Sequence, residues 1–356
     1  MKKALDFIIK SMNGMAYGLF STLIIGTIIG TIANFFEEGV IYAVLNSLSI
    51  LLKNLTGVGI GIGIAWSLKI DGLKMICSAV SGGITSYFTN VSFYDFFRVV
   101  DYDYFIEKAK FQIGDPLSIY LVVICTILLM NIVLRKKTPV DIIIIPLFTV
   151  FVATTITLFI CEPISLLTKV IGNFVNSATV LQPFLMGIVI SVVMGMALTA
   201  PISSAAIAVT IGLDGLAGGA AVVGCCVQML GFAVMSRKDN NIGMVISIGI
   251  GTSMLQFKNI IKKPIIWLPT IIASAILGPV STCFLKLKCM SPNNSGMGTA
   301  GLVGVIGTFN EMGFSLRNFI IIILMEIILP GILVFLIDLL FRKFKWIKDG
   351  DLKVND

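Results

Sequence analysis

Long apolar runs without a charged side chain are the feature that most limits how this chain can fold. Residues 16–36 and 117–134 each form such a run, and a helix needs about 20 apolar residues to cross the hydrocarbon core of a bilayer. Over the whole chain 13% of residues are charged, against about 25% in soluble domains. Mean hydropathy is +1.00. The sequence therefore predicts an all-α polytopic membrane protein that lies in a lipid bilayer.

The basic residues lie in short clusters between the apolar runs. The clusters are at residues 2–3, 135–137, 237–238, 262–263 and 342–348, and the formal net charge is +7. Because basic residues collect on the cytoplasmic side of membrane proteins, this pattern predicts cytoplasmic N- and C-termini. It does not indicate a nucleic-acid partner. Counting the apolar runs gives about nine or ten membrane elements, including re-entrant hairpins, and the number of true crossings between Glu162 and Arg237 stays open.

The chain has no histidine, and its seven cysteines lie mostly within apolar runs. Histidine is the most common metal ligand and the usual proton shuttle near neutral pH. No two cysteines form a CxxC pair, so a zinc or redox motif is not indicated. The sequence predicts no metal site, no cofactor and no catalytic or phosphoryl-carrying residue of its own.

The most unusual stretch covers residues 291–313, SPNNSGMGTAGLVGVIGTFNEMG. A lipid-facing helix is not built this way, because glycine weakens a helix and polar side chains cost free energy in hydrocarbon. Irregular backbone at membrane depth persists only when it is buried in protein or lines a wet cavity. We therefore expect a broken or re-entrant element that forms a polar site. The alternative is an external loop followed by a packing helix of small residues.

Within this stretch Glu311 is the foremost candidate, because an intramembrane glutamate is a functional hypothesis by default. Its structural alternative is a cap for the helix that starts near Phe314. The pattern Gly296-Met-Gly-Thr-Ala-Gly301 does not indicate a dinucleotide site, because no strand precedes it. The predicted substrate-binding residues are Glu311, Asn310, Asn293, Asn294, Gly298, Thr299, Ser203, Ser204, Gln228 and Glu162.

Other irregular segments support a division of the chain into halves. Residues 40–70 carry alternating glycines, so either one helix bends there or two shorter pieces meet. Pro163 follows Glu162 and predicts a helix break, and Pro201 ends the helix before Ser203. Residues 243–256 are apolar but short and lie between basic clusters, which predicts an excursion that returns to the cytoplasm. We expect scaffold and dimerisation helices in residues 1–160, a substrate-binding half in 161–341 and a cytoplasmic tail in 342–356.

Several long motifs resemble a known family. They are TAPISSAAIA at residues 199–208, the glycine-rich run at 215–236, GTSMLQ at 251–256 and GMGTAGLVG at 296–304. They are similar to membrane IIC components of the bacterial phosphotransferase system, in the subgroup that includes perfringolysin-regulator-like proteins. The resemblance implies an EIIC-like fold in a bacterial cell membrane, a homodimer, and a sugar bound between re-entrant hairpins. It further implies separate IIB and IIA proteins, with a hairpin glutamate on the sugar, for which Glu311 is the candidate.

Three functions remain open at this point. The first is a sugar-specific IIC permease, which acts at most as the membrane component of a sugar phosphotransferase. The family's frequent histidine is missing here, so coupled phosphorylation is less firmly implied than binding. The second is a membrane-bound sensor or regulator of gene expression that binds a ligand without transporting it. The third is an ion-coupled permease with Glu326 or Glu162 as its proton site.

Overall fold

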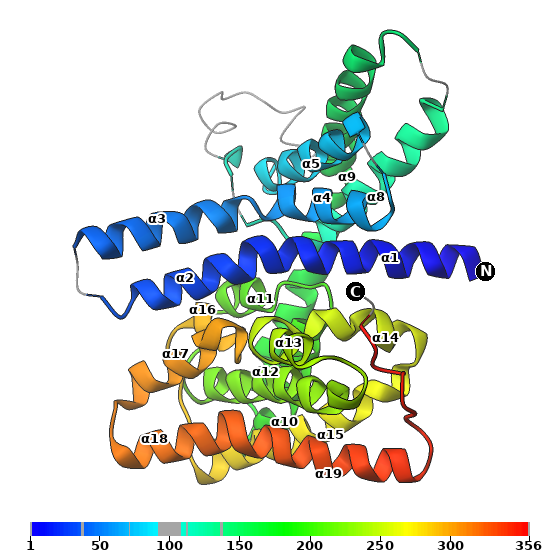
Figure 1. Ribbon diagram of the computed structural model, residues 1–356. Coiled ribbons are helices and arrows are strands. Elements are labelled where there is room, and N and C mark those ends of the chain that lie inside the picture. The colour runs from blue at the N-terminus through cyan, green and yellow to red at the C-terminus, as the bar shows by residue number, and fades with distance from the viewer. Residues whose placement is uncertain are drawn as a thin grey trace. The chain divides into compact units, whose positions relative to one another are not determined.

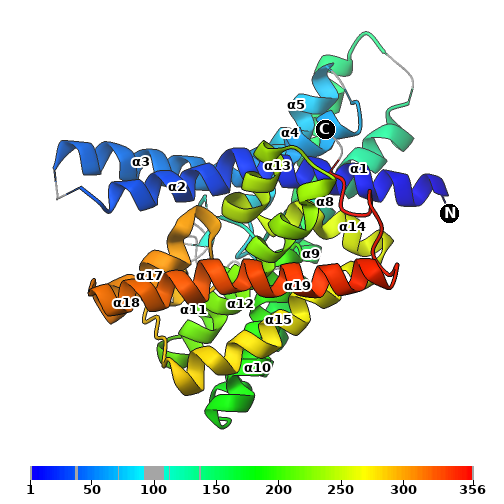
Figure 2. The same ribbon diagram turned by 60° about the horizontal axis from the view of Figure 1, so that its bottom comes forward.

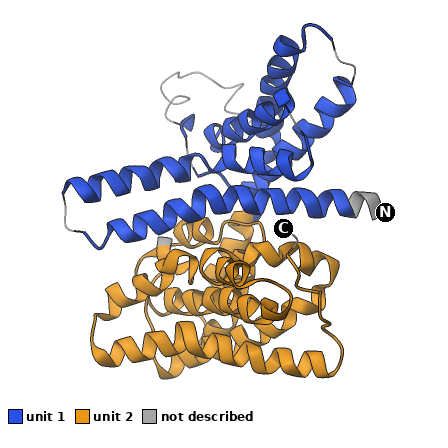
Figure 3. Ribbon diagram, in the orientation of Figure 1, with its two compact units in different colours: residues 1–167 blue, residues 168–356 orange. Residues whose placement is uncertain are grey.

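The computed structural model describes residues 2–36, 39–70, 72–91, 108–111, 113–135 and 138–354. Every described element is a helix, which confirms the predicted all-α class. The chain forms two compact units, Met1–Leu167 and Thr168–Asp356 (Figure 3). The scaffold role of the first half and the substrate-binding role of the second stay predictions.

The described helices include six that are long and apolar enough to cross a membrane. A seventh span results if the bent pair Val40–Asn54 and Thr56–Ser67 is counted as one. Two shorter apolar helices, Pro183–Thr199 and Ile242–Gly251, add elements that are too short for an ordinary span. The polytopic architecture with irregular membrane elements is therefore as predicted.

The described part of the first unit consists of helices (Figure 1). They are α1 (Lys2–Leu19), η1 (Phe20–Ile24), α2 (Ile25–Ala33), α3 (Val40–Asn54), α4 (Thr56–Ser67), α5 (Gly72–Tyr87), α8 (Pro116–Val133) and α9 (Asp141–Thr179). Helices α2 and α3 lie side by side, and Ser49 of α3 donates a hydrogen bond to the carbonyl of Gly26 in α2 at 2.6 Å. This contact explains why small residues repeat along α2, because they let a second backbone approach closely.

The alternating glycines of α4 allow close packing against two different helices, α1 and α5. A Cβ on Gly63 would lie 2.1 Å from the carbonyl oxygen of Gly14 in α1, and one on Gly61 would lie 2.1 Å from that of Ser78 in α5. Residues four apart share a helix face, so Gly59 and Gly63 face α1 while Gly57 and Gly61 face α5. At residues 40–70 the helices α3 and α4 meet at an angle of 51°, and the choice between one bent span and two separate pieces stays open.

Helix α9 differs from the expected break at Pro163. It runs without interruption through Pro146 and Pro163 and passes from the first unit into the second. A proline inside a helix removes one backbone hydrogen bond but need not end the helix when the flanking apolar turns are retained. Glu162 is therefore part of a continuous helix in the first unit.

The second unit is organised around α12 (Gly215–Met235), nearly all of whose residues are buried. Helices α10 (Pro183–Thr199), α15 (Leu268–Pro279) and α19 (Leu329–Lys343) pack against it. Figure 2 shows α18 (Leu316–Ile323), η8 (Leu324–Ile328) and α19 as one long rod across α12 and α15. The remaining elements are α11 (Ser204–Thr210), η2 (Ser236–Lys238), α13 (Ile242–Ile246), η3 (Ser247–Gly251), η4 (Ser253–Gln256), α14 (Phe257–Lys262), η5 (Pro264–Trp267), η6 (Val280–Phe284), α16 (Pro292–Ser295), η7 (Ala300–Leu302) and α17 (Val303–Met312).

Candidate functional site

The stretch that the sequence singles out is a broken helical element, as expected. Between α16 and α17 the backbone takes left-handed conformations at Gly298 (φ +53°), Gly301 (φ +54°) and Leu302 (φ +59°). Left-handed backbone costs little for glycine but is strained for leucine. At Gly298 a side chain has no room either, because a Cβ there would lie 2.6 Å from the Cβ of Cys225 in α12. Glycine at this position therefore allows the backbone of the broken element to pack directly against α12.

A second broken element meets the first. The π-helical segment η3 ends at Thr252, whose backbone is extended (φ −160°, ψ 133°), and the short helix η4 follows. The Thr299 hydroxyl of the first element donates to the carbonyl of Gly249 in η3 at 2.6 Å. Two backbone breaks from distant parts of the chain thus meet through a short, buried hydrogen bond.

A buried polar network lies behind this meeting point. Thr199, at the end of α10, contacts the hydroxyl of Ser253 at 2.9 Å and donates to Gln228 Oε1 at 3.3 Å. We call Thr199, Gln228, Ser253 and Thr299 the polar centre. The four side chains are no more than 1% exposed, so buried hydrogen bonds take the place of water.

Gln228 is the member with unused bonding capacity. Its Oε1 accepts hydrogen bonds from Trp267 Nε1 and from the Thr270 hydroxyl, each at 3.0 Å, in addition to Thr199. Its Nε2 has no partner among the described residues. Three donors fix the orientation of the amide, and a buried donor without an acceptor is costly unless a guest uses it.

A second unusual polar group lies in η8. Glu326 is fully buried, and its Oε1 accepts a hydrogen bond from the Thr308 hydroxyl of α17 at 2.8 Å. Its Oε2 has no partner among the described residues. The segment is a π-helical interruption, a feature that often marks functional positions. A buried carboxyl group without a cation carries a large desolvation cost, so this group is a candidate for binding a proton or a ligand.

The structure brings only part of the predicted site together. Thr299 and Gln228 lie in the polar centre, and Gly298 forms the break beside Thr299. Ser204 donates to the carbonyl of Gly296 at 2.7 Å, which ties α11 to the same broken element. Ser203 caps α11 by accepting the amide of Ala206 at 3.2 Å.

The remaining predicted residues lie elsewhere. Asn310 and Glu311 are exposed at the C-terminal end of α17. Asn294 is partly buried, and its side chain fills the space over Gly307. The side chain of Asn293 lies outside the described part of the chain, and Glu162 belongs to the first unit. Their roles in substrate binding stay predictions.

Sequence reasoning did not single out Thr199, Ser253 or Thr308 as individual site residues. Isolated hydroxyl residues in apolar runs usually bond to their own helix, as Thr126 does to the carbonyl of Val122 at 2.7 Å. Nothing in their local sequence distinguishes them from that case. These residues are distinguished only by their tertiary contacts, which form when the chain folds.

Comparison with known proteins gives one result. A family model described as "Phosphotransferase system, EIIC" matches residues 9–354. No curated protein and no solved structure matches the chain. The matched range includes the two broken elements and all of the polar centre. The chain therefore belongs to the EIIC family of the phosphotransferase system and is a multi-pass membrane protein of that system.

Proposed function

We propose that this protein is a sugar-specific permease component that binds a sugar at the polar centre and presents it to a separate IIB protein for phosphorylation. The supporting observation is the meeting of two backbone breaks beside Gln228, whose amide donor has no partner among the residues that the structure describes. Hydroxyl and amide groups in this arrangement suit a polyhydroxylated guest, which offers many acceptors and donors. The proposal includes a homodimer in a bacterial cell membrane with both termini in the cytoplasm.

The polar centre is closed in this conformation, because its side chains are almost completely buried. A cavity of about 400 Å³ lies instead near the start of α12, lined by residues that include Leu181, Ile211 and Asp214. Binding at the polar centre therefore requires the two broken elements to separate. Such a change between occluded and open states is what alternating access at a broken-helix site needs.

Replacing Thr299 with valine is expected to lower sugar uptake by about tenfold, the effect of losing one hydrogen bond of about 1.4 kcal/mol. The substitution keeps the side-chain shape but removes the hydroxyl, which leaves Gly249 when the two elements separate and can then bond to the sugar. Uptake of a radiolabelled sugar panel into proteoliposomes containing IIA, IIB and phosphoenolpyruvate measures this effect, and accumulation as sugar phosphate reports coupling.

Thr126→Val is the matched control, because it removes a buried hydroxyl that bonds only within α8. Its uptake should stay near that of the unmodified protein. Glu311→Gln tests the rival position at the end of α17. If Glu311→Gln abolishes uptake while Thr299→Val leaves it unchanged, the binding site lies at Glu311 and not at the polar centre. Saturable binding without net uptake would favour the sensor function.

Glu326 supports a second candidate function, a permease driven by a proton gradient. Its full burial, and an Oε2 that no described residue contacts by a hydrogen bond, favour this alternative. We expect Glu326→Gln to remove any stimulation of uptake by an inward pH gradient, because a glutamine cannot bind and release a proton. The measurement is uptake without IIB at zero and at one unit of imposed pH difference. If uptake by the unmodified protein is the same with and without the pH gradient, this alternative is wrong.

A further inference from the structure

The C-terminal residues fold back onto the second unit. After α19 the chain turns, and Ile347, Leu352 and Val354 become buried, with Leu352 fully so. Figure 1 shows this segment (red) returning toward α13 and α14. We call residues 347–354 the C-terminal strap. The sequence predicts a tail here but gives no sign of this docking, because the segment is short and polar.

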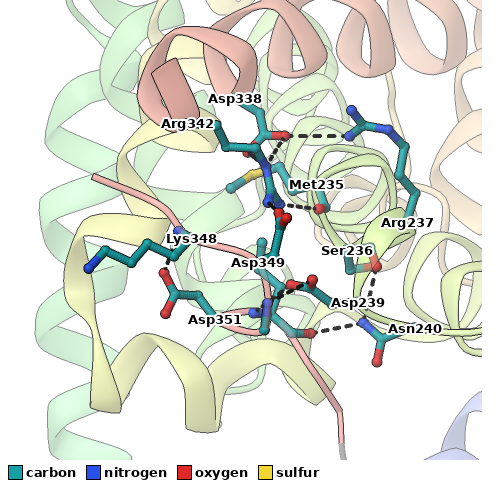
Figure 4. Close-up of polar contacts among 12 residues, drawn as sticks. Met235, Ser236, Arg237, Asp239, Asn240, Asp338, Arg342, Lys348, Asp349 and Asp351 are labelled. Carbon is teal, nitrogen blue, oxygen red and sulfur yellow. Dashed lines mark hydrogen bonds and ion pairs between the residues drawn. The ribbon is translucent and has the colours of Figure 1, made fainter. Parts of the chain in front are cut away.

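The strap is bound through its backbone by the side chains of Asp239 and Asn240, which directly follow η2. The carboxylate of Asp239 accepts the amide of Gly350 at 2.8 Å and that of Leu352 at 3.1 Å. Asn240 Oδ1 accepts the amide of Val354 at 2.8 Å. Figure 4 shows Asp239 and Asn240 beside the strap residues. A carboxylate that accepts two backbone amides makes a strong, directional attachment.

One carbonyl oxygen of the strap joins two points of the chain that are far apart in sequence. Asn240 Nδ2 and Gln256 Nε2 both donate to the carbonyl of Leu352, each at 2.9 Å. Residues 241–255 therefore leave and return to the same place. That this loop enters the membrane and returns to the cytoplasm stays a prediction. We call these residues the excursion.

Further bonds continue along the returning side of the excursion. Asn259 Nδ2 donates to the carbonyl of Lys353 at 3.2 Å, and Lys263 pairs with Asp351 at 2.6 Å. Partial burial alone would raise the pKa of Asp351, but the hydrogen bonds from Lys263 and from the Lys348 backbone, with their charges, lower it. Asp351 is therefore ionised at neutral pH and holds the ion pair.

The excursion carries one side of the polar centre. Gly249, beyond the middle of the excursion, accepts the Thr299 hydroxyl, and Ser253, on its returning side, contacts Thr199. The strap fixes the base of the excursion, and Gly249 and Ser253 within the excursion close the polar centre. We propose that the C-terminal strap is a positioning element that holds the excursion in its closed state, and that detachment of the strap frees the excursion to open the polar centre.

The proposal is tested by hydrogen exchange of the full-length protein in lipid nanodiscs, followed by mass spectrometry. The double variant Asn240→Asp, Gln256→Glu places two carboxylates against the Leu352 carbonyl and keeps the shapes of both side chains. We expect amides in residues 241–255 to exchange about tenfold faster or more, because local opening controls exchange. Amides of α5 should keep their rates.

Asn318→Asp is the matched control, because Asn318 Nδ2 also donates to backbone carbonyls, those of Met312 and Gly313, at a site without strap contacts. It should leave exchange in the excursion unchanged. A second variant that ends at Trp346 removes the strap entirely. If the excursion exchanges at unmodified rates in that variant, the proposal is wrong. The measurement uses no sugar, so its outcome is independent of whether the polar centre binds one.

Discussion

Replacing Gly224 with alanine is expected to destabilise the second unit by about 3 kcal/mol, at the upper end of what overpacking usually costs. A Cβ at this position would lie 1.9 Å from the carbonyl oxygen of Ser191 in α10. The clash is with backbone, so no side-chain rotation relieves it. Gly195 of α10 lies at the same helix contact, since a Cβ added there would lie 2.6 Å from the carbonyl oxygen of Gly224. Helices α10 and α12 must therefore move apart, which also displaces Thr199 from Gln228 and reduces uptake.

The matched control is Gly331→Ala in α19. A Cβ there meets nothing nearer than a Val234 methyl group at 3.6 Å, an ordinary contact. Alanine is favoured over glycine within a helix by up to about 1 kcal/mol, so this variant should be as stable as the unmodified protein or slightly more stable. Thermal unfolding in detergent, followed by tryptophan fluorescence, compares the two variants. Equal melting temperatures for both would contradict the close approach of α10 and α12.

The apolar runs predict the fold class because each spanning helix satisfies its own backbone and needs few residues from elsewhere. Glycine spacing likewise predicts close packing at the start of α12, since small residues let a second backbone approach. The break near Gly298 is also predicted by the sequence, because its closely spaced glycines stand beside the polar residues Asn293, Asn294 and Thr299. Each of these features depends on residues that are close together in the sequence, so a single sequence is enough to predict it.

The polar centre itself could be predicted only in part. Thr299 and Gln228 attract attention as polar residues in apolar surroundings, but Ser253 and Thr199 become neighbours only after folding. The two carboxylates show the same limit. Glu311 stands among glycines and amides along the chain and is exposed, whereas Glu326 stands in an apolar run and is fully buried. The sequence around each glutamate therefore does not predict which of the two carboxyl groups is buried.

The strap could not be predicted, because its attachment uses backbone groups. Residues 347–354 offer their amides and carbonyls to Asp239, Asn240 and Gln256, and any sequence has such groups. The buried ion pairs beside the strap are equally hidden. Basic residues at 237–238 and 342–348 fit the topology rule equally well whether or not they pair with an acid.

Replacing Asp338 with asparagine is expected to cost about 3–5 kcal/mol of unfolding free energy, the usual effect of removing one partner of a buried ion pair. Asp338 is fully buried in α19, and its two oxygens accept from Arg342 Nε at 3.0 and 2.9 Å. Arg237, in η2 directly after α12, approaches it at 3.4 Å. Figure 4 shows both arginines converging on this carboxylate. Loss of the charge leaves two guanidinium groups facing a neutral amide.

The effect should extend to the strap, because Arg342 also pairs with Asp349 at 2.6 Å and donates to the carbonyl of Met235 at 3.0 Å. Asp6→Asn is the matched control, since Asp6 forms an exposed pair with Lys10 in α1, and exposed pairs contribute at most about 1 kcal/mol. Chemical unfolding in detergent measures both variants. We expect a large loss for Asp338→Asn that is independent of salt, and almost none for Asp6→Asn. A small loss for Asp338→Asn would mean that apolar packing around α19, and not the arginine pairs, holds the ends of α12 and α19 together.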